Sequence, residues 1–169
     1  MKNIFRISLL VVFLLGMNAN VFSQVKLGHI NTNELLQQMP GRETATKELE
    51  KYAGELESTF TAMQREFQTK YQDYLEKQET FSQLIRQSKE RELESLQQRI
   101  MEFQESAQED LMQKENQLLR PIIEKARKAI EDVARENGFT YVFDTSMGVL
   151  LYSEPSDNIM DKVKAKIGI

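Results

Sequence analysis

The stretch FTYVFDTSMGVLLYS, residues 139–153, decides the fold because it carries the clearest β-pattern in the chain. Residues 139–144 place an aromatic side chain at every second position, and residues 149–153 form a second, largely apolar run. Between them, Gly148 supplies a residue that tolerates positive φ. We therefore expect two short strands around a turn. A lone hairpin of this size is only marginally stable in water, so it must pack against another part of the protein.

The composition favours an extended, helix-rich protein over a compact enzyme. The chain has 169 residues, of which 40% are hydrophobic and 28% charged, with three Pro, no Trp and no Cys. The absence of Cys excludes disulfides, thiolate metal sites and a lipid-modified N-terminal Cys. With one His and no GxxxxGK[ST] motif, the sequence has almost no material for a catalytic site, and we expect neither an enzyme nor a cofactor.

The N-terminus has the pattern of an export signal. Lys2 and Arg6 precede the apolar run ISLLVVFLLG, and Val21 and Ser23 occupy the small-residue positions before a cut ahead of Gln24. The run is short for a membrane span, so we favour a cleaved signal peptide at 1–23 over an uncleaved anchor, and expect no stable membrane insertion after cleavage. Without the signal, 20 basic residues face 26 acidic ones, a net charge of −6, which argues against a nucleic-acid partner.

A short strand and a short helix follow the predicted cut. VKLGHIN, residues 25–31, alternates weakly, and the following residues 31–39 place Leu35, Leu36 and Met39 on one side of a helix that ends before Pro40. His29, the only histidine, lies in the strand, where a structural role is more common than a catalytic one.

Two long heptad patterns occupy the middle of the chain. The first begins at Arg42, and the second begins after Ser88 and changes frame near Leu111, a stutter that locally unwinds a supercoil. Pro121 lies inside the second pattern and should bend that helix. The apolar positions of the first pattern are Leu49, Ala53, Leu56, Phe60, Met63, Phe67, Tyr74, Phe81 and Leu84, and those of the second begin with Leu93, Leu96, Ile100, Phe103 and Ala107.

The two patterns could form one continuous rod or a helical hairpin. We favour a hairpin that reverses within the polar segment TFSQLIRQSKER, residues 80–91, because it returns strand 25–31 to residues 139–153. That β-hairpin then gains a third strand. A last amphipathic helix, within residues 156–168, completes a body too small to be stable without self-association. The predicted fold class is α+β, with a long antiparallel helical hairpin projecting from a small β body.

Two segments carry a resemblance to a known family. KLGHINTNELLQQM, residues 26–39, and AIEDVARENGFTYVFDTSMGVLLYSEPSDNIMDKV, residues 129–163, closely resemble the Skp/OmpH family of periplasmic chaperones for outer-membrane proteins. The resemblance implies a homotrimer in which residues 24–41 and 121–169 form a β body and residues 42–120 form an arm. It suggests the following residues as the core of the trimer body: Leu27, Ile30, Val142, Phe143, Val149 and Leu151.

The resemblance also implies an ATP-independent holdase in the periplasm. Three arms would enclose an unfolded outer-membrane protein, whose exposed strand edges would otherwise aggregate. Candidate contacts with this partner are the apolar side chains of the arm: Phe60, Met63, Phe67, Tyr71, Tyr74, Phe81, Met101 and Phe103. At heptad spacing, most of these residues are expected to pack the two helices together.

The charge of the arm differs from the strongly basic arms that the resemblance implies. Residues 41–120 contain 12 Lys and Arg against 17 Asp and Glu, a net charge of −5. This argues against electrostatic capture of lipopolysaccharide or another anionic partner by the arm. Of a basic lipopolysaccharide site on the second arm helix, only Lys114 is a plausible remnant. The heptads alone would also allow a structural coiled-coil adaptor or spacer in the cell envelope.

Overall fold

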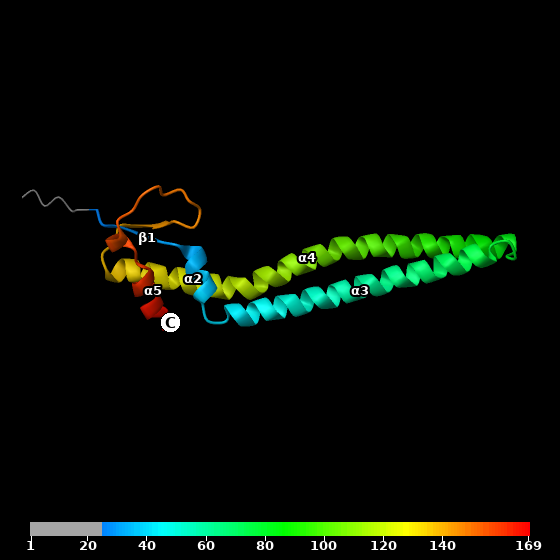
Figure 1. The fold of residues 1–169 in the computed structure, drawn as a ribbon, viewed down its shortest axis with the longest axis horizontal. Coiled ribbons are helices and arrows are strands. Elements are labelled where there is room, and N and C mark those ends of the chain that lie inside the picture. The colour runs from blue at the N-terminus through cyan, green and yellow to red at the C-terminus, as the bar shows by residue number, and fades with distance from the viewer. Residues whose placement is uncertain (1–24) are drawn as a thin grey trace, which may run out of the picture.

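The computed structural model describes residues 25–169, so the predicted signal peptide lies outside the described residues. Its architecture is α+β, as expected, with a long helical hairpin attached to a small body (Figure 1). No described helix combines the length and the apolar character needed to cross a membrane. In chain order the elements are β1 (Leu27–Ile30), α2 (Thr32–Gln38), α3 (Arg42–Lys77), α4 (Gln83–Glu136), β2 (Tyr141–Asp144), the 3₁₀ turn η1 (Pro155–Asp157) and α5 (Met160–Ile167).

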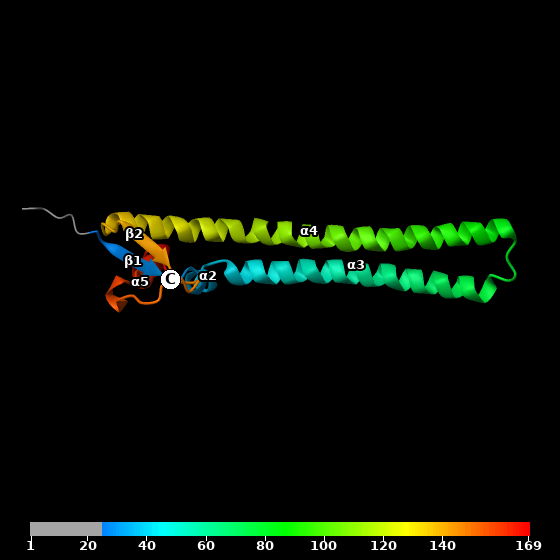
Figure 2. The same ribbon diagram turned by 90° about the horizontal axis from the view of Figure 1, so that it is seen from above.

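The helices α3 and α4 run antiparallel and form the projecting arm (Figure 2). With 36 residues, α3 spans about 54 Å at 1.5 Å per residue. The chain reverses between Lys77 and Gln83, at the beginning of the segment predicted for the turn. The reversal is this early because the Ser82 hydroxyl caps α4 by accepting a hydrogen bond from the Ile85 amide at 3.4 Å. Phe81 therefore lies in the loop between the two helices, and Leu84 lies at the start of α4.

The 54-residue helix α4 belongs to both parts of the molecule. Most of α4 packs on α3, with cross-helix ion pairs from Lys70–Glu92 to Lys114–Glu48, and its C-terminal end carries the body (Figure 1). Pro121 lies inside the helix, as predicted, where α4 passes from arm to body. The helix ends at Glu136, with Asn137 as its cap and Gly138 at φ 70°. That left-handed residue turns the chain back along α4 into β2.

The sheet contains two described strands, which lie at opposite ends of the sequence. β1 and β2 pair in parallel, with Leu27 opposite Tyr141 and Ile30 opposite Asp144. The return of the first strand to residues 139–144 is therefore confirmed. The predicted β-hairpin is wrong for the single chain, because residues 149–153 form no strand and have no β-partner among residues 25–169. The alternating residues of β2 pair with β1 instead of with residues 149–153. This second run therefore lies outside the sheet.

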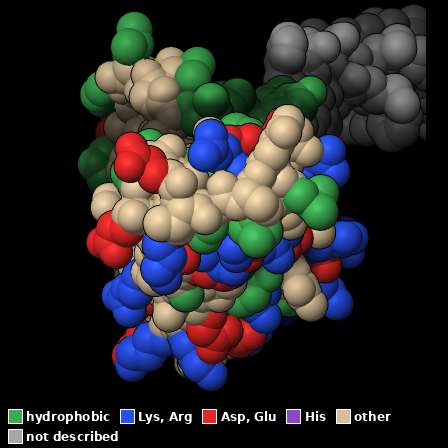
Figure 3. All heavy atoms as spheres, turned by 90° about the vertical axis from the view of Figure 1, so that its right-hand side faces the viewer, with side chains coloured by type: hydrophobic (Ala, Val, Ile, Leu, Met, Phe, Trp, Pro, Cys, Tyr) green, Lys and Arg blue, Asp and Glu red, His purple; other side chains and the backbone are tan. Residues whose placement is uncertain are grey.

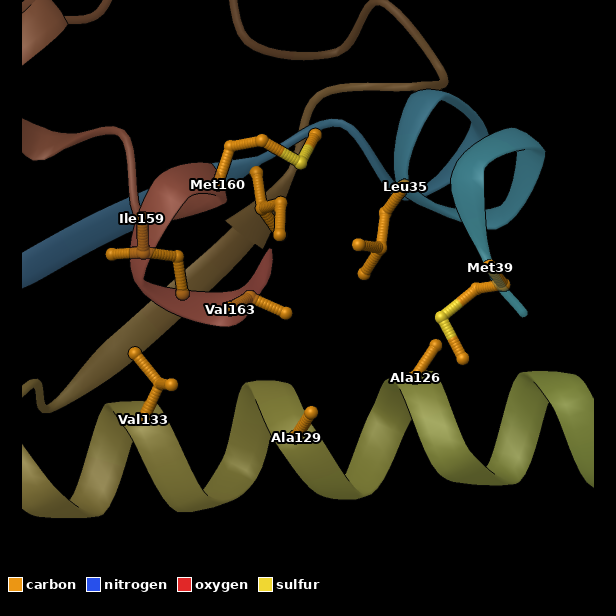
Figure 4. Packing of buried hydrophobic residues seen from close by; sticks show 9 residues of the cluster. Leu35, Met39, Ala126, Ala129, Val133, Ile159, Met160 and Val163 are labelled. Atoms are coloured by element: carbon orange, nitrogen blue, oxygen red, sulfur yellow. The ribbon is translucent and has the colours of Figure 1, made fainter. Parts of the chain in front are cut away.

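The body core lies between α4, α2 and α5 (Figure 4). Ile159 and Val163 come from the α5 end, Leu35 comes from α2, and all three side chains are fully buried. Small residues on α4, Ala126 and Ala129, let the two short helices approach it closely. The body thus has one compact apolar centre, to which β1 (through Ile30), α2, α4 and α5 all contribute buried side chains.

Gly28 in β1 is required by close packing. A Cβ atom at this position would lie 3.0 Å from two ring carbons of Phe139 and 3.3 Å from Ile159. The neighbouring His29 is buried, and its Nε2 lies 3.2 Å from the carbonyl oxygen of Glu154. His29 therefore fixes the segment before α5 to the sheet.

Candidate functional site

The heptad positions of α3 and α4 that face each other form an apolar seam along the arm. This seam contains most of the aromatic residues that were predicted to contact a partner. Leu96 is buried to 1% exposure at its centre. Tyr71 and Met101 differ from the rest, because 43% and 51% of their surface remains exposed. Half-buried between the helices or at their turn are Phe60, Met63, Phe67, Tyr74, Phe81 and Phe103. The main structural role of these six residues is thus to join α3 to α4.

Charged residues inside the seam are paired across it. Lys70 forms an ion pair with Glu92 of α4, and Glu92 also accepts a hydrogen bond from Lys89 at 3.0 Å. The hydrogen bond from Lys70, followed by the one from Lys89, holds the pKa of the Glu92 carboxyl below its ordinary value. Lys114 donates to Glu48 at 2.6 Å. Its ammonium group is therefore engaged with a carboxylate within the arm.

A hollow opens on one side of the arm, between the middle of α3 and the facing part of α4. Its volume is about 310 Å³, and Glu57, Gln104 and Gln108 stand at its rim. The apolar lining consists of Ala53, Leu56, Phe60, Phe103, Ala107 and Leu111. Three of these residues, at positions 103, 107 and 111, lie where the heptad pattern changes frame, so the hollow coincides with the stutter in the sequence.

The tip of the arm exposes apolar side chains among charges of both signs. Leu84 is 78% exposed and Ile85 is 47% exposed, whereas the rings of Tyr74 and Phe81 lie 6.4 Å apart at the end of the seam. Seen from the tip, blue and red side chains alternate over the hairpin, and hydrophobic side chains gather at the top, where the loop after β2 rises in Figure 1 (Figure 3). The arm surface therefore combines isolated apolar groups with a solvated, charged background.

The predicted body residues divide into an inner and an outer set. Ile30 is 1% exposed and belongs to the core of the single chain, and Val142 packs against that core. The outer set is not covered by any of residues 25–169: Leu27 is 45% exposed, Phe143 45%, Val149 77% and Leu151 98%. The six residues therefore do not form one cluster within a single chain.

Sequence reasoning missed three further members of this outer surface. Tyr141, Met147 and Tyr152 are 60%, 81% and 75% exposed. The signal for Tyr141 was present, because it alternates with Phe143 and shares its face of β2. No periodic signal marks Met147 or Tyr152. We call Leu27, Tyr141, Phe143, Met147, Val149, Leu151 and Tyr152 the open face of the body.

An apolar groove of about 500 Å³ lies beside the open face. Ile123, Ile130 and Ala134 of α4 form one wall, and residues 139–142 form the other. The groove and the open face leave the body with apolar surface that nothing in the described chain covers.

The loop that carries four of the seven open-face residues is fixed at its start by Asp144. This carboxylate accepts hydrogen bonds from the Thr32 hydroxyl at 2.6 Å, the Thr32 amide at 3.2 Å and the Ser146 amide at 2.9 Å. Burial alone would raise the pKa of Asp144, but these hydrogen bonds together outweigh it and hold the pKa below its ordinary value. Asp144 thereby ties the end of β2 to the start of α2.

Among the described residues, no group of three or more His, Asp or Glu side chains could hold a metal ion. The arm and the open face of the body both expose apolar side chains, which suits them to contacts with other polypeptide chains.

Comparison with protein families gives one match that spans nearly all described residues. The model of the family described as "Outer membrane protein (OmpH-like)" matches residues 26–167. The matched range includes β1, the whole arm and α5, so it covers body and arm alike.

Two relatives are named "Chaperone protein Skp". The protein from Photorhabdus laumondii is 25% identical over 142 residues, covering 84% of this chain and 85% of the relative. The protein from Photorhabdus luminescens is 24% identical over 153 residues, covering 90% and 92%.

A solved structure has the same fold. The crystal structure of a proposed outer membrane chaperone (OmpH-like) from Caulobacter crescentus CB15 superimposes with a TM-score of 0.72 at 13% identity, covering 84% of this chain and 83% of that one. At this identity the likeness concerns the fold alone.

Proposed function

The chain belongs to the Skp/OmpH family, and from this premise we propose that it is a chaperone that holds unfolded outer-membrane proteins in the periplasm and prevents their aggregation. The similarity to two proteins named Skp chaperones supports this proposal. The structural observation that carries it is the arm, which presents two long helical surfaces away from the body (Figure 2). Such a shape provides a large surface for many weak contacts and little for a single tight pocket.

We propose that three copies assemble through the open face of the body. Apolar side chains that stand 45–98% exposed, including Phe143, Val149 and Leu151, are unfavourable in water, and a second chain can cover them. In this proposal residues 24–41 and 121–169 form the body, residues 42–120 form the arm, and residues 1–23 direct export before they are removed. Three arms on one body would surround a cavity.

The held partner contacts the arms through side chains that the seam leaves accessible. Tyr71 and Met101 are the exposed members of the predicted set, and a flexible Met adapts to many apolar partners. Six other members, of which Phe60 and Phe103 are examples, contribute only the part of their surface that faces solvent. Holding is reversible because each contact is small. No catalytic step and no nucleotide take part in the proposed cycle.

Light scattering tests this function. A urea-unfolded outer-membrane barrel is diluted into buffer with increasing amounts of the mature protein, and without nucleotide. The proposal predicts suppression that saturates near three chains per unfolded barrel. Unchanged scattering at a large excess would overturn it and would favour the structural adaptor, which would bind one folded envelope partner instead.

A further inference from the structure

The negative charge of the arm is concentrated in its body-proximal part. Residues 42–69 and 93–120, which we call the acidic part, contain 7 Lys and Arg against 12 Asp and Glu, whereas residues 70–92 at the tip contain five of each. The whole excess of the arm thus lies in the acidic part, on the side of the tip that leads to the body.

Ion pairing within the described chain leaves this acidic excess in place. Four of the 12 carboxylates in the acidic part, those of Glu43, Glu48, Glu55 and Glu66, form ion pairs within the described chain. Eight carboxylates remain without one, against three of the seven basic side chains. The acidic part therefore presents unneutralised carboxylates to whatever approaches it.

The hollow lies in the middle of this acidic part. Its lining is apolar and combines the small residues Ala53 and Ala107 with the larger Phe60 and Phe103. Its volume of about 310 Å³ is at the lower end of the range of ligand pockets, which suits a large side chain better than a folded surface. Gln104 and Gln108 at the rim can donate to and accept from a peptide backbone.

Three of the unpaired carboxylates share the face on which the hollow opens. Glu50 lies seven residues before Glu57, and Glu115 lies seven residues after Gln108, so the helical period places them beside the hollow. A second copy of the arm would bring the same negative charge to this face and would be repelled.

We propose that the hollow and its carboxylates bind an extended segment of an unfolded chain that combines an aromatic side chain with neighbouring Lys or Arg residues. The aromatic ring fills the hollow, and the cationic groups lie against Glu50, Glu57 and Glu115. This inference rests on the proposed chaperone function and names the chemical class of segment that the arm selects.

Peptides test the inference on the unaltered protein. Three labelled Gly-Ser peptides are compared by fluorescence anisotropy: one carries Phe and Lys, one carries Phe and Glu, and one carries Ala and Lys. We expect the Phe and Lys peptide to bind roughly tenfold more tightly than either of the others, and its affinity to fall as salt is raised. Equal binding of the Lys and Glu peptides would overturn the inference.

Two pairs of variants locate the contact. Ala107→Leu fills the hollow, and Ala62→Leu makes the same change at an exposed position of α3. We expect the first variant to bind the Phe and Lys peptide about fivefold more weakly. The second variant should bind it with unchanged affinity. Replacing Glu50, Glu57 and Glu115 together by Gln should weaken binding of the Phe and Lys peptide by a similar factor. Replacing Glu76 and Glu79 at the tip by Gln should leave its affinity unchanged. Equal affinities within either pair would refute the placement.

The aggregation assay separates this inference from the proposed function. Suppressed aggregation without a preference among the peptides would overturn the inference alone. A clear preference for the Phe and Lys peptide, with no suppression of aggregation, would overturn the chaperone proposal and leave the binding surface in place.

Discussion

Replacing Leu96 by Ala should lower the free energy of unfolding of the arm by a large amount for the loss of one side chain. The Leu96 side chain is only 1% exposed, in a seam where the facing aromatic residues are half-buried. The change removes three buried carbon groups, worth roughly 0.8 kcal/mol each, or about 2.4 kcal/mol of transfer free energy. Only two helices surround the site, so the cavity can partly collapse, and we expect a total near the low end of the ~2–5 kcal/mol seen for Leu→Ala in cores.

Urea unfolding followed by far-ultraviolet circular dichroism measures this loss. The comparison must be made at one fixed protein concentration, because self-association changes the apparent stability. Leu84→Ala is the matched control, since Leu84 is 78% exposed at the tip and its truncation should change the free energy of unfolding by less than about 0.5 kcal/mol. If Leu96→Ala cost no more than Leu84→Ala, Leu96 would not be buried between α3 and α4 as the structure places it.

Three further predictions concern the body. Gly28→Ala should destabilise it by about 1–3 kcal/mol, because the added methyl would lie 3.0 Å from the Phe139 ring; an unchanged melting temperature would contradict this packing. The lowered pKa of Asp144 stabilises the fold above the pKa of an unfolded Asp, about 3.9, and this contribution is lost as the pH falls through the lower folded value. The free energies of unfolding of wild type and Asp144→Asn, measured as the pH is lowered, should therefore converge below about pH 4. A constant difference between the two would exclude a stabilising contribution from the ionised Asp144 carboxylate. Leu151→Lys, at a side chain that is 98% exposed, should weaken self-association in sedimentation without changing the helix content, and an unaltered oligomer would place Leu151 outside the interface.

Periodicity predicted the long elements because each is long enough for its pattern to stand out. The heptads gave the two arm helices, and the pairing of β1 with β2 followed from closing the hairpin. The turn was placed late because Phe81 and Leu84 continue the heptad frame, whereas the Ser82 cap starts α4 before that frame ends. A local hydrogen bond therefore outweighed the longer pattern.

The second β-run could not be placed from its residues alone. An apolar segment such as residues 149–153 indicates a strand only where a partner edge exists, and within the described chain β1 already pairs with β2. The hollow in the arm was equally hidden, because its volume depends on the size of Ala53 and Ala107 across the seam. Only the stutter at Leu111 marked its place in the sequence.

Native mass spectrometry can measure the mass of the mature protein alone and of its complex with one unfolded outer-membrane barrel. We expect a trimer for the free protein and three copies bound to one barrel chain. A monomeric free protein, or a barrel chain that leaves the trimer unbound, would contradict the claim that three arms on one body enclose the unfolded partner.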